Sequence, residues 1–437
     1  METKTENKGN SLVSFDPHNS LVRVDAVINK VTFRGCPICE NPVAEVLHSQ
    51  NFVLHDSHPL ANAYDVVACT VCGMVYADTG SSQRAYDALY QDVSRYQDNK
   101  TSTGGGESVW DAERLSETAR TLASLLPDKT TRILDIGCAN GGLLEALRAL
   151  GFSNLTGIDP APICVANTRQ RGFAAYVGSL SAIPAEVPPF DFVILSHVLE
   201  HVRDLHSAMT SLRPLLHPAS SVYIEVPDAT RYCQFLNAPF ENFNTEHINH
   251  FSATCLHNLM RQYGLAPGGP AVAKVVKSSL DTLYPAVFAT YSFGSTTSAP
   301  ITNPIMKDES LKGRILQYAG LSTDLMRSMN QHLSQELANC PEVALWGTGQ
   351  LAMKLLNDEP LRTARIRACI DGNPVNQGKQ LRGIPILAPS QLTGIDCPIV
   401  ITTTQHETEI RRNIDGLGIS NRLVSLRVQE PLAGASL

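Results

Sequence analysis

The stretch RILDIGCANGGLLEAL, residues 132–147, decides the fold of this 437-residue chain. A short apolar strand ends at Asp135, Gly137 permits a sharp turn, and Gly141 begins a glycine pair that lets the backbone approach a ligand before a helix starts. The following apolar segment, LTGID, ends at Asp159, where an acid can bind ribose hydroxyls. Together these features predict a site for an adenosine-type ligand.

Apolar and helical segments alternate on either side of this stretch. FDFVILS at 190–196 and SVYIEVP at 221–227 have the composition of buried strands, and a helical pattern separates them. Such alternation predicts βαβ units and a mostly parallel sheet. A second αβ series begins with VALWGTG at 343–349 and continues through RIRACID and PIVITTT. The Pro/Ser/Thr-rich segment 294–304 and a helical pattern at about 307–337 separate the two series.

Two cysteine pairs precede both series, in CPIC at Cys36 and Cys39 and in CTVC at Cys69 and Cys72. Two closely spaced pairs can supply four thiolates to one tetrahedral ion, for which zinc is the expected metal. Four thiolates close the coordination sphere, so the predicted role is structural. The alternative is chance pairing in a chain with 11 cysteines.

Length, charge and hydropathy exclude several classes of protein. The chain exceeds the roughly 250–300 residues at which single cores stop growing, so two or three domains are expected. Its net charge of −7 argues against broad binding to nucleic acid or acidic membranes. We find neither an apolar run long enough to span a bilayer nor a signal peptide, and we expect a cytoplasmic protein with reduced thiols.

The segment FENFNTEHINHFS, residues 240–252, holds the candidate acid-base residues Glu246, His247 and His250. A carboxylate beside an imidazole can orient it and raise its basicity, which favours His247 as a general base assisted by Glu246. The segment follows a predicted strand at the sheet edge where open αβ sheets bind ligands. The alternative is a helix entry that carries surface histidines.

LDIGCANGGLL, together with GIDP and FDFVILSHVLEHV, resembles the class I S-adenosylmethionine-dependent methyltransferases. This resemblance implies a seven-stranded Rossmann-like sheet. It also implies a donor site with Asp135, Gly137, Cys138 and Gly141 at the methionine end, Asp159 at the ribose and Ser179 near the adenine. The histidines of SHVLEHV, His197 and His201, are expected to be architectural or to line the pocket.

The whole layout is similar to three-domain sugar C-methyltransferases, which act on keto-intermediates of nucleotide-linked deoxysugars. Their catalytic segment contains a Tyr-His-Glu-His pattern, of which Glu246 and His247 are kept while Asn244 stands at the tyrosine position. The resemblance implies a further catalytic tyrosine after the zinc module, for which Tyr96 is favoured over Tyr90. It also implies a C-terminal Rossmann-like domain with Asp371 at the end of its second strand.

The expected divisions are a disordered tail at 1–30, a four-cysteine zinc module at 31–88, a methyltransferase domain at 89–297, a linker and helix at 298–338, and a second Rossmann-like α/β domain at 339–437. The expected reaction is C-methylation of a small nucleotide-linked sugar, with S-adenosylmethionine as donor and no nucleic-acid or membrane partner. Two alternatives remain open, namely O- or N-methylation of a small metabolite and a non-catalytic zinc-containing adaptor.

Overall fold

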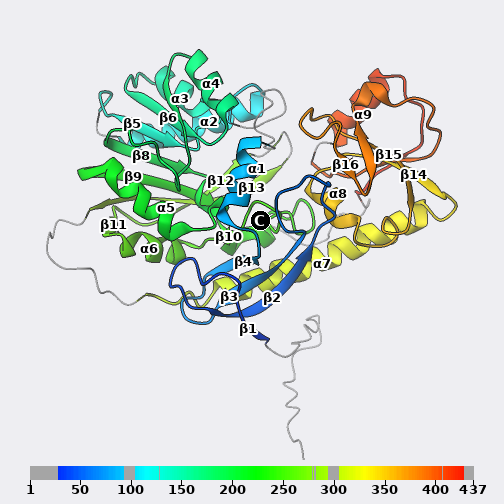
Figure 1. The fold of residues 1–437 in the computed structure, drawn as a ribbon, viewed down its shortest axis with the longest axis horizontal. Helices are drawn as coiled ribbons and strands as arrows, with labels where there is room; N and C mark the ends of the chain where they lie inside the picture. Colours follow the sequence, from blue (N-terminus) through cyan, green and yellow to red (C-terminus); the bar gives the residue numbers. More distant parts are fainter. Residues whose placement is uncertain are drawn as a thin grey trace, which may run out of the picture.

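Three β-sheets follow one another along the chain, and Figure 1 shows the central and C-terminal sheets on opposite sides of the molecule. The computed structural model describes residues 28–92, 104–126, 128–277, 279, 282–293, 305–405 and 407–427. The expected tail at 1–30 lies almost wholly outside these ranges.

The N-terminal sheet is antiparallel and borrows its last strand from a distant part of the sequence. Its order is β1 (Asn29–Val31), β2 (Val43–Asn51), β3 (Ala63–Cys69), β4 (Val75–Thr79) and β10 (Asn249–His250). The β10 strand pairs with β4, with Asn249 opposite Tyr76 and His250 opposite Val75. The segment that contains His247 is therefore joined directly to the sheet that contains the cysteines. Helix α1 (Gln83–Asp92) follows β4.

The central sheet has five parallel strands and an antiparallel edge. Its order is β11 (Leu265–Pro267), β13 (Leu283–Phe293), β9 (Leu216–Pro227), β8 (Phe190–Ser196), β5 (Ile133–Ile136), β6 (Leu155–Asp159) and β7 (Ala174–Val177), with β12 (Val272–Lys277) also paired to β13. The prediction of seven strands was therefore one too few. The additional strand, β12, forms an antiparallel pair with β13 and is mostly exposed, so its sequence lacks the continuous apolar run that marked the parallel strands.

Helices cover both faces of the central sheet because its strands are apolar on both sides. All four residues of β5 are buried. The helices are α2 (Val109–Leu125), α3 (Gly142–Ala149), α4 (Pro162–Gln170), α5 (Leu205–Leu212) and α6 (Ala253–Gln262), with 3-10 turns η2 (Leu199–His201), η3 (Arg213–Leu215) and η4 (Ala229–Gln234). Leu122 of α2 and Leu144 of α3 share one apolar core with Ile133, while Leu205 of α5 and Leu256 of α6 belong to the other.

The C-terminal sheet is also mainly parallel. Its order is β16 (Gln380–Leu381), β17 (Ile384–Leu387), β15 (Arg365–Ile370), β14 (Glu342–Trp346), β18 (Ile399–Ile401) and β19 (Leu423–Val424), accompanied by α8 (Gln350–Leu355), η5 (Pro389–Gln391) and α9 (Glu407–Gly416). The strands expected in RIRACID and PIVITTT are confirmed as β15 and β18. Only the short β16 is antiparallel to its neighbour.

The long helix α7 (Leu311–Glu336) runs past the N-terminal sheet toward the C-terminal sheet in Figure 1. Its buried residues, among them Ile315, Tyr318 and Leu333, belong to a core that also includes Val66 of the N-terminal sheet and Val343 of the C-terminal sheet. This continuous core fixes the sheets relative to one another. None of the helices in the described ranges combines the length and apolar character needed to cross a bilayer.

Candidate active site

A cavity of about 590 Å³ lies where the carboxyl ends of the central parallel strands face the C-terminal sheet. Its walls include Asp135 of β5, Asp159 at the end of β6 and His197 just after β8. Lys354 of α8 lies on the opposite side. The volume is typical of a small-molecule site. The position agrees with the rule that open αβ sheets bind ligands beyond the carboxyl ends of their strands.

Most of the predicted donor residues line this cavity, namely Asp135, Gly137, Cys138, Asp159 and Ser179. Gly137 has a φ of +81°, and a Cβ there would come within 2.9 Å of Val198, so the turn requires glycine.

Gly141 is the one predicted donor residue outside the cavity lining. It precedes α3 with a φ of +79°, and a Cβ there would lie 3.0 Å from the Thr168 hydroxyl. Gly141 therefore shapes the loop through its own backbone and its packing against α4.

The two donor-side aspartates are buried and hold protons more tightly than usual. Asp159 accepts hydrogen bonds from the backbone N–H groups of Ala139, at 2.8 Å, and Ala161, at 2.9 Å, and so fixes the glycine loop. Burial raises the pKa of Asp159 to about 6 despite these bonds. Burial and the nearby Asp159 charge raise the pKa of Asp135 to about 8. At pH 7 Asp135 is therefore mostly protonated, and a cation beside it would favour loss of that proton.

The segment before β10 is shaped by Asn244, the residue that replaces the expected tyrosine. Its side-chain oxygen accepts hydrogen bonds from the backbone N–H groups of Glu246, at 2.9 Å, and His247, at 2.8 Å. Its carbonyl accepts a bond from Tyr64 of β3 at 2.8 Å. Asn244 and His247 both line the cavity. An asparagine suits this position because its short amide closes a local turn.

The two predicted catalytic residues of this segment occupy different places. His247 lines the cavity, whereas the Glu246 carboxylate accepts a hydrogen bond from the Tyr90 hydroxyl of α1 at 3.2 Å. The Glu246 carbonyl accepts a bond from Nδ1 of His201 at 3.1 Å. Glu246 thus ties the segment to both α1 and η2. Tyr96, the favoured tyrosine, lies outside the described residues, while Tyr90 contributes to the cavity wall.

His197 lines the cavity and is positively charged, a property that could not be predicted from the sequence. It has a φ of +57°, and its ring lies between Glu200 and Glu225, with an oxygen of each carboxylate 3.1 Å from a ring nitrogen. Burial opposes the charged ring, but the two carboxylates outweigh it and raise the pKa of His197 to about 9. His197 is therefore an imidazolium at neutral pH and cannot act as a base there. The hydroxyl of Tyr284 lies 3.1 Å from Nε2.

The C-terminal sheet supplies a second set of residues that sequence reasoning missed. The Lys354 side chain donates a hydrogen bond to the carbonyl of Phe240, and Gln350 donates to the Thr245 hydroxyl at 2.7 Å. Burial lowers the pKa of Lys354 to about 7 against the pull of Glu241. Burial raises the pKa of Glu241 to about 7. Sequence reasoning missed them because their contacts depend on how α8 packs against residues 240–252, which local sequence does not display.

The glycine turn that follows β14 is stabilised by contacts within the C-terminal sheet. Gly347 has a φ of +102° and lines the cavity with Gly349. Asp371, at the end of β15, accepts hydrogen bonds from the backbone N–H of Thr348, at 2.9 Å, and from its hydroxyl. In this structure the Asp371 carboxylate stabilises the turn.

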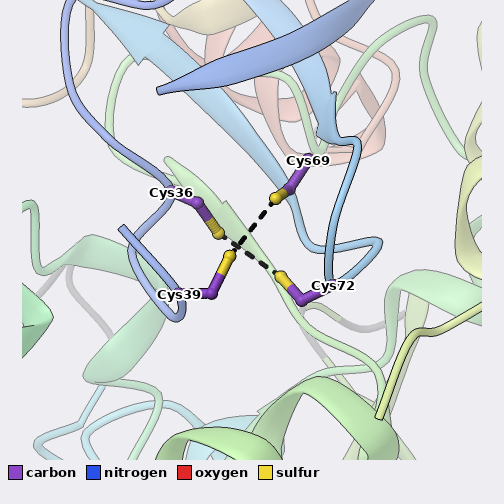
Figure 2. Close-up of side chains that lie close together, drawn as sticks. All are labelled: Cys36, Cys39, Cys69 and Cys72. Atoms are coloured by element: carbon purple, nitrogen blue, oxygen red, sulfur yellow. Dashed lines mark hydrogen bonds between the residues drawn. The ribbon is translucent and has the colours of Figure 1, made fainter. Parts of the chain in front are cut away.

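The four predicted metal ligands converge at one end of the N-terminal sheet, as Figure 2 shows. The sulfur atoms of Cys36 and Cys72 are 3.4 Å apart, as are those of Cys39 and Cys69, and all four lie within 4.8 Å of one another. A tetrahedral ion with Zn–S bonds of about 2.3 Å needs sulfur separations of about 3.8 Å, so the cluster fits zinc with small adjustments.

Comparison with known proteins supports the central part of this assignment. Residues 110–267 match a family described as methyltransferase domain, and residues 340–425 match one described as C2185-like, N-terminal. A ubiquinone biosynthesis O-methyltransferase of Cereibacter sphaeroides is 35% identical over 24% of this chain and 44% of its own length. A tRNA U34 carboxymethyltransferase of Saccharophagus degradans is 30% identical over 24% of this chain and 35% of its own.

The chain thus spans less than half the length of either curated relative. A solved methyltransferase structure from Methanosarcina mazei, 15% identical, covers 39% of this chain and 96% of its own with a TM-score of 0.34. The similarity to methyltransferases thus lies in residues 110–267, which match the methyltransferase domain family.

Proposed function

We propose that the protein methylates a carbon beside the ketone of a nucleotide-linked keto-deoxysugar, with S-adenosylmethionine as the donor. One observation carries the proposal: the donor-side Asp135 and Asp159 share a single cavity with His247. A donor and an acceptor bound there would be held beside the same basic side chain. Such positioning supplies much of the rate in reactions between two bound substrates.

When bound, S-adenosylmethionine supplies a methyl group activated by its positive sulfur. In the proposed site, Asp135 and Asp159 hold the cationic donor, and Gly137 and Cys138 form the wall against it. His247 removes a proton from the acceptor carbon, which leaves an enolate as the nucleophile. Glu246 acts as a positioning residue, since it connects the His247 segment to Tyr90 and His201.

The charge of His197 is balanced within the wall of the proposed site. His197 is an imidazolium held between two buried carboxylates, which accept both of its ring N–H groups. Through these contacts His197 helps to set the shape of this wall. Its pKa of about 9 keeps the charge in place throughout the physiological pH range.

The remaining parts of the proposal concern architecture and location. We propose that Cys36, Cys39, Cys69 and Cys72 hold a structural zinc ion, and that the C-terminal sheet forms a second Rossmann-like domain that closes the acceptor side of the cavity. Lys354 and Gln350 support this, because they reach from α8 to the His247 segment. A cytoplasmic location is proposed with them.

The test uses a donor labelled in its methyl group and a panel of nucleotide-linked keto-sugars, with the products analysed by mass spectrometry. We expect the label on carbon, where it survives treatment with hydriodic acid, a reagent that cleaves methyl ethers. Asp159→Asn should reduce incorporation because donor binding weakens. An acid-labile label, or incorporation only into acceptors without a ketone, would overturn the carbon assignment.

O-methylation of a small metabolite is the second candidate, and the C. sphaeroides relative, an O-methyltransferase, favours it. His247 would then remove a proton from a hydroxyl group. Exchange of deuterium from the acceptor carbon into water distinguishes C-methylation from O-methylation, because only C-methylation passes through an enolate. Exchange without donor turnover would establish the carbon reaction.

A further inference from the structure

Beside the proposed base, three side chains with metal-ligating atoms meet in the cavity wall. Glu200, His201 and His247 each offer one ligand atom, and these atoms all lie within 4.8 Å of one another. All three residues line the cavity. The His201 and His247 rings are 4.9 Å apart and nearly perpendicular.

The hydrogen bonds around His201 prepare one of its nitrogens for a metal. Nδ1 of His201 lies 3.1 Å from the Glu246 carbonyl, which can only accept, so Nδ1 carries the proton. When the ring carries one proton, its lone pair is on Nε2, which lies 3.9 Å from Oε1 of Glu200, the oxygen that also contacts His197. Metal-bound histidines typically donate their other N–H to a carbonyl or carboxylate in this way.

Glu200 is the second independent indication of a ligand. It is 1% exposed, and one oxygen, Oε1, accepts a bond from His197. The other oxygen, Oε2, is buried and has no hydrogen-bond partner among the described residues. A buried carboxylate oxygen without a hydrogen-bond partner has lost its contacts with water and gained none in the protein, which costs free energy. A bound metal ion can offset this desolvation cost.

We infer that Glu200, His201 and His247 form a binding site for a divalent transition-metal ion such as Zn²⁺, separate from the four-cysteine cluster. Two imidazoles and a carboxylate suit ions of intermediate softness. Zn–N bonds of about 2.0–2.1 Å require the ligand atoms to move together by roughly an ångström, within reach of side-chain rotation. The fourth position would face the cavity.

The next step rests on the proposed function: metal binding at this site should inhibit methyl transfer. A ligated His247 has its lone pair on the metal and cannot accept a proton from the acceptor. Binding of Zn²⁺ should therefore inhibit methyl transfer without displacing the donor, whose predicted contacts come from Asp135 and Asp159.

Titration with Co²⁺ tests the site itself on the full chain after its cysteine cluster has been filled with zinc. We expect one equivalent to bind with visible d–d bands and without sulfur charge-transfer bands. His201→Ala and Glu200→Gln should each weaken this binding by at least about 100-fold. The matched control is His206→Ala, since His206 is exposed and outside the cavity. Two variants that stay folded by circular dichroism yet bind Co²⁺ normally would overturn the inference.

A second experiment measures the turnover of each protein with and without Zn²⁺. The wild type and His206→Ala should lose at least about tenfold in turnover, and the loss should reverse on chelation. His201→Ala should retain the same turnover in both conditions. If no methyl transfer is found at all, the proposed function fails while Co²⁺ binding still reports on the site. If transfer occurs and Co²⁺ does not bind, only the metal site is wrong.

Discussion

At the scale of single residues, two histidines of one cavity have different surroundings, and we propose different roles for them. His197 is locked as a cation because Glu200 and Glu225 lie on either side of its ring. His247 belongs to a segment whose backbone is set by the side chain of Asn244. The residue type alone therefore does not identify a base; the neighbouring charges decide the protonation state.

His247→Ala should lose at least about 100-fold in turnover, the usual scale for removal of a general base. Donor affinity should stay near that of the wild type, because the predicted donor contacts come from other residues. Single-turnover kinetics and calorimetry measure the two quantities separately. His206→Ala serves as the exposed-histidine control. Near-normal turnover of His247→Ala would exclude it as the base, and equal loss of donor binding would make its role structural.

Donor binding should strengthen as the pH rises from about 6 to about 8, since the pKa values of Asp159 and Asp135 lie at these limits. Below this range both carboxyls are neutral and attract the cationic donor weakly; above it both are charged. Binding at pH 7 should release protons, which calorimetry in buffers of different protonation enthalpy detects. Asp135→Asn should release fewer protons. Equal release by wild type and variant would show that Asp135 does not titrate on binding.

At the scale of elements, the pairing of β10 with β4 links the cysteine cluster to the catalytic segment. The β4 strand begins shortly after Cys72, and β10 begins two residues after His247. Arg34, next to the first cysteine pair, extends the link, because its guanidinium donates hydrogen bonds to the Asn249 side chain and the Ile248 carbonyl. The cluster therefore influences the position of His247 through a short chain of backbone contacts.

Cys36→Ser should lose the bound zinc and reduce turnover on the order of 100-fold, because small displacements of a catalytic group are costly. Donor affinity should change little, as the glycine loop belongs to the other sheet. Native mass spectrometry gives the metal content, and steady-state kinetics separate turnover from donor affinity. Cys340→Ser, at a half-buried thiol far along the chain, is the control. Retained zinc, or lost zinc with unchanged turnover, would refute the link.

At the scale of the whole molecule, the features that could be predicted from the sequence are those that a local pattern of residues encodes. Parallel strands buried on both faces, such as β5 and β8, are continuous apolar runs, and the cysteine pairs have a regular spacing. By contrast, β10 is two residues long and depends on a partner about 170 positions away, as its pairing with β4 shows. The charge of His197 depends on Glu225, and the cavity wall at Lys354 depends on how the C-terminal sheet packs. Such features arise from tertiary contacts, which one sequence does not display.

Lys354 provides a test of how the C-terminal sheet packs against the cavity. Burial lowers its pKa in the folded protein to about 7, below the usual lysine value of 10.5. Folding therefore opposes its protonation, and Lys354 destabilises the protein fully below about pH 7, with the penalty fading as the pH rises toward 10.5. Lys354→Met removes a charge that is hard to bury and keeps much of the volume.

We expect Lys354→Met to raise the free energy of unfolding at pH 6.5 by up to about 4 kcal/mol. Loss of the hydrogen bond to the Phe240 carbonyl should reduce this gain. Urea unfolding at several pH values measures this difference, which should shrink steadily between pH 7 and 10. Lys307→Met, at an exposed lysine outside the cavity, is the control. If the difference between variant and wild type is independent of pH, Lys354 keeps its charge when folded, and the C-terminal sheet does not seal this wall from water as the structure indicates.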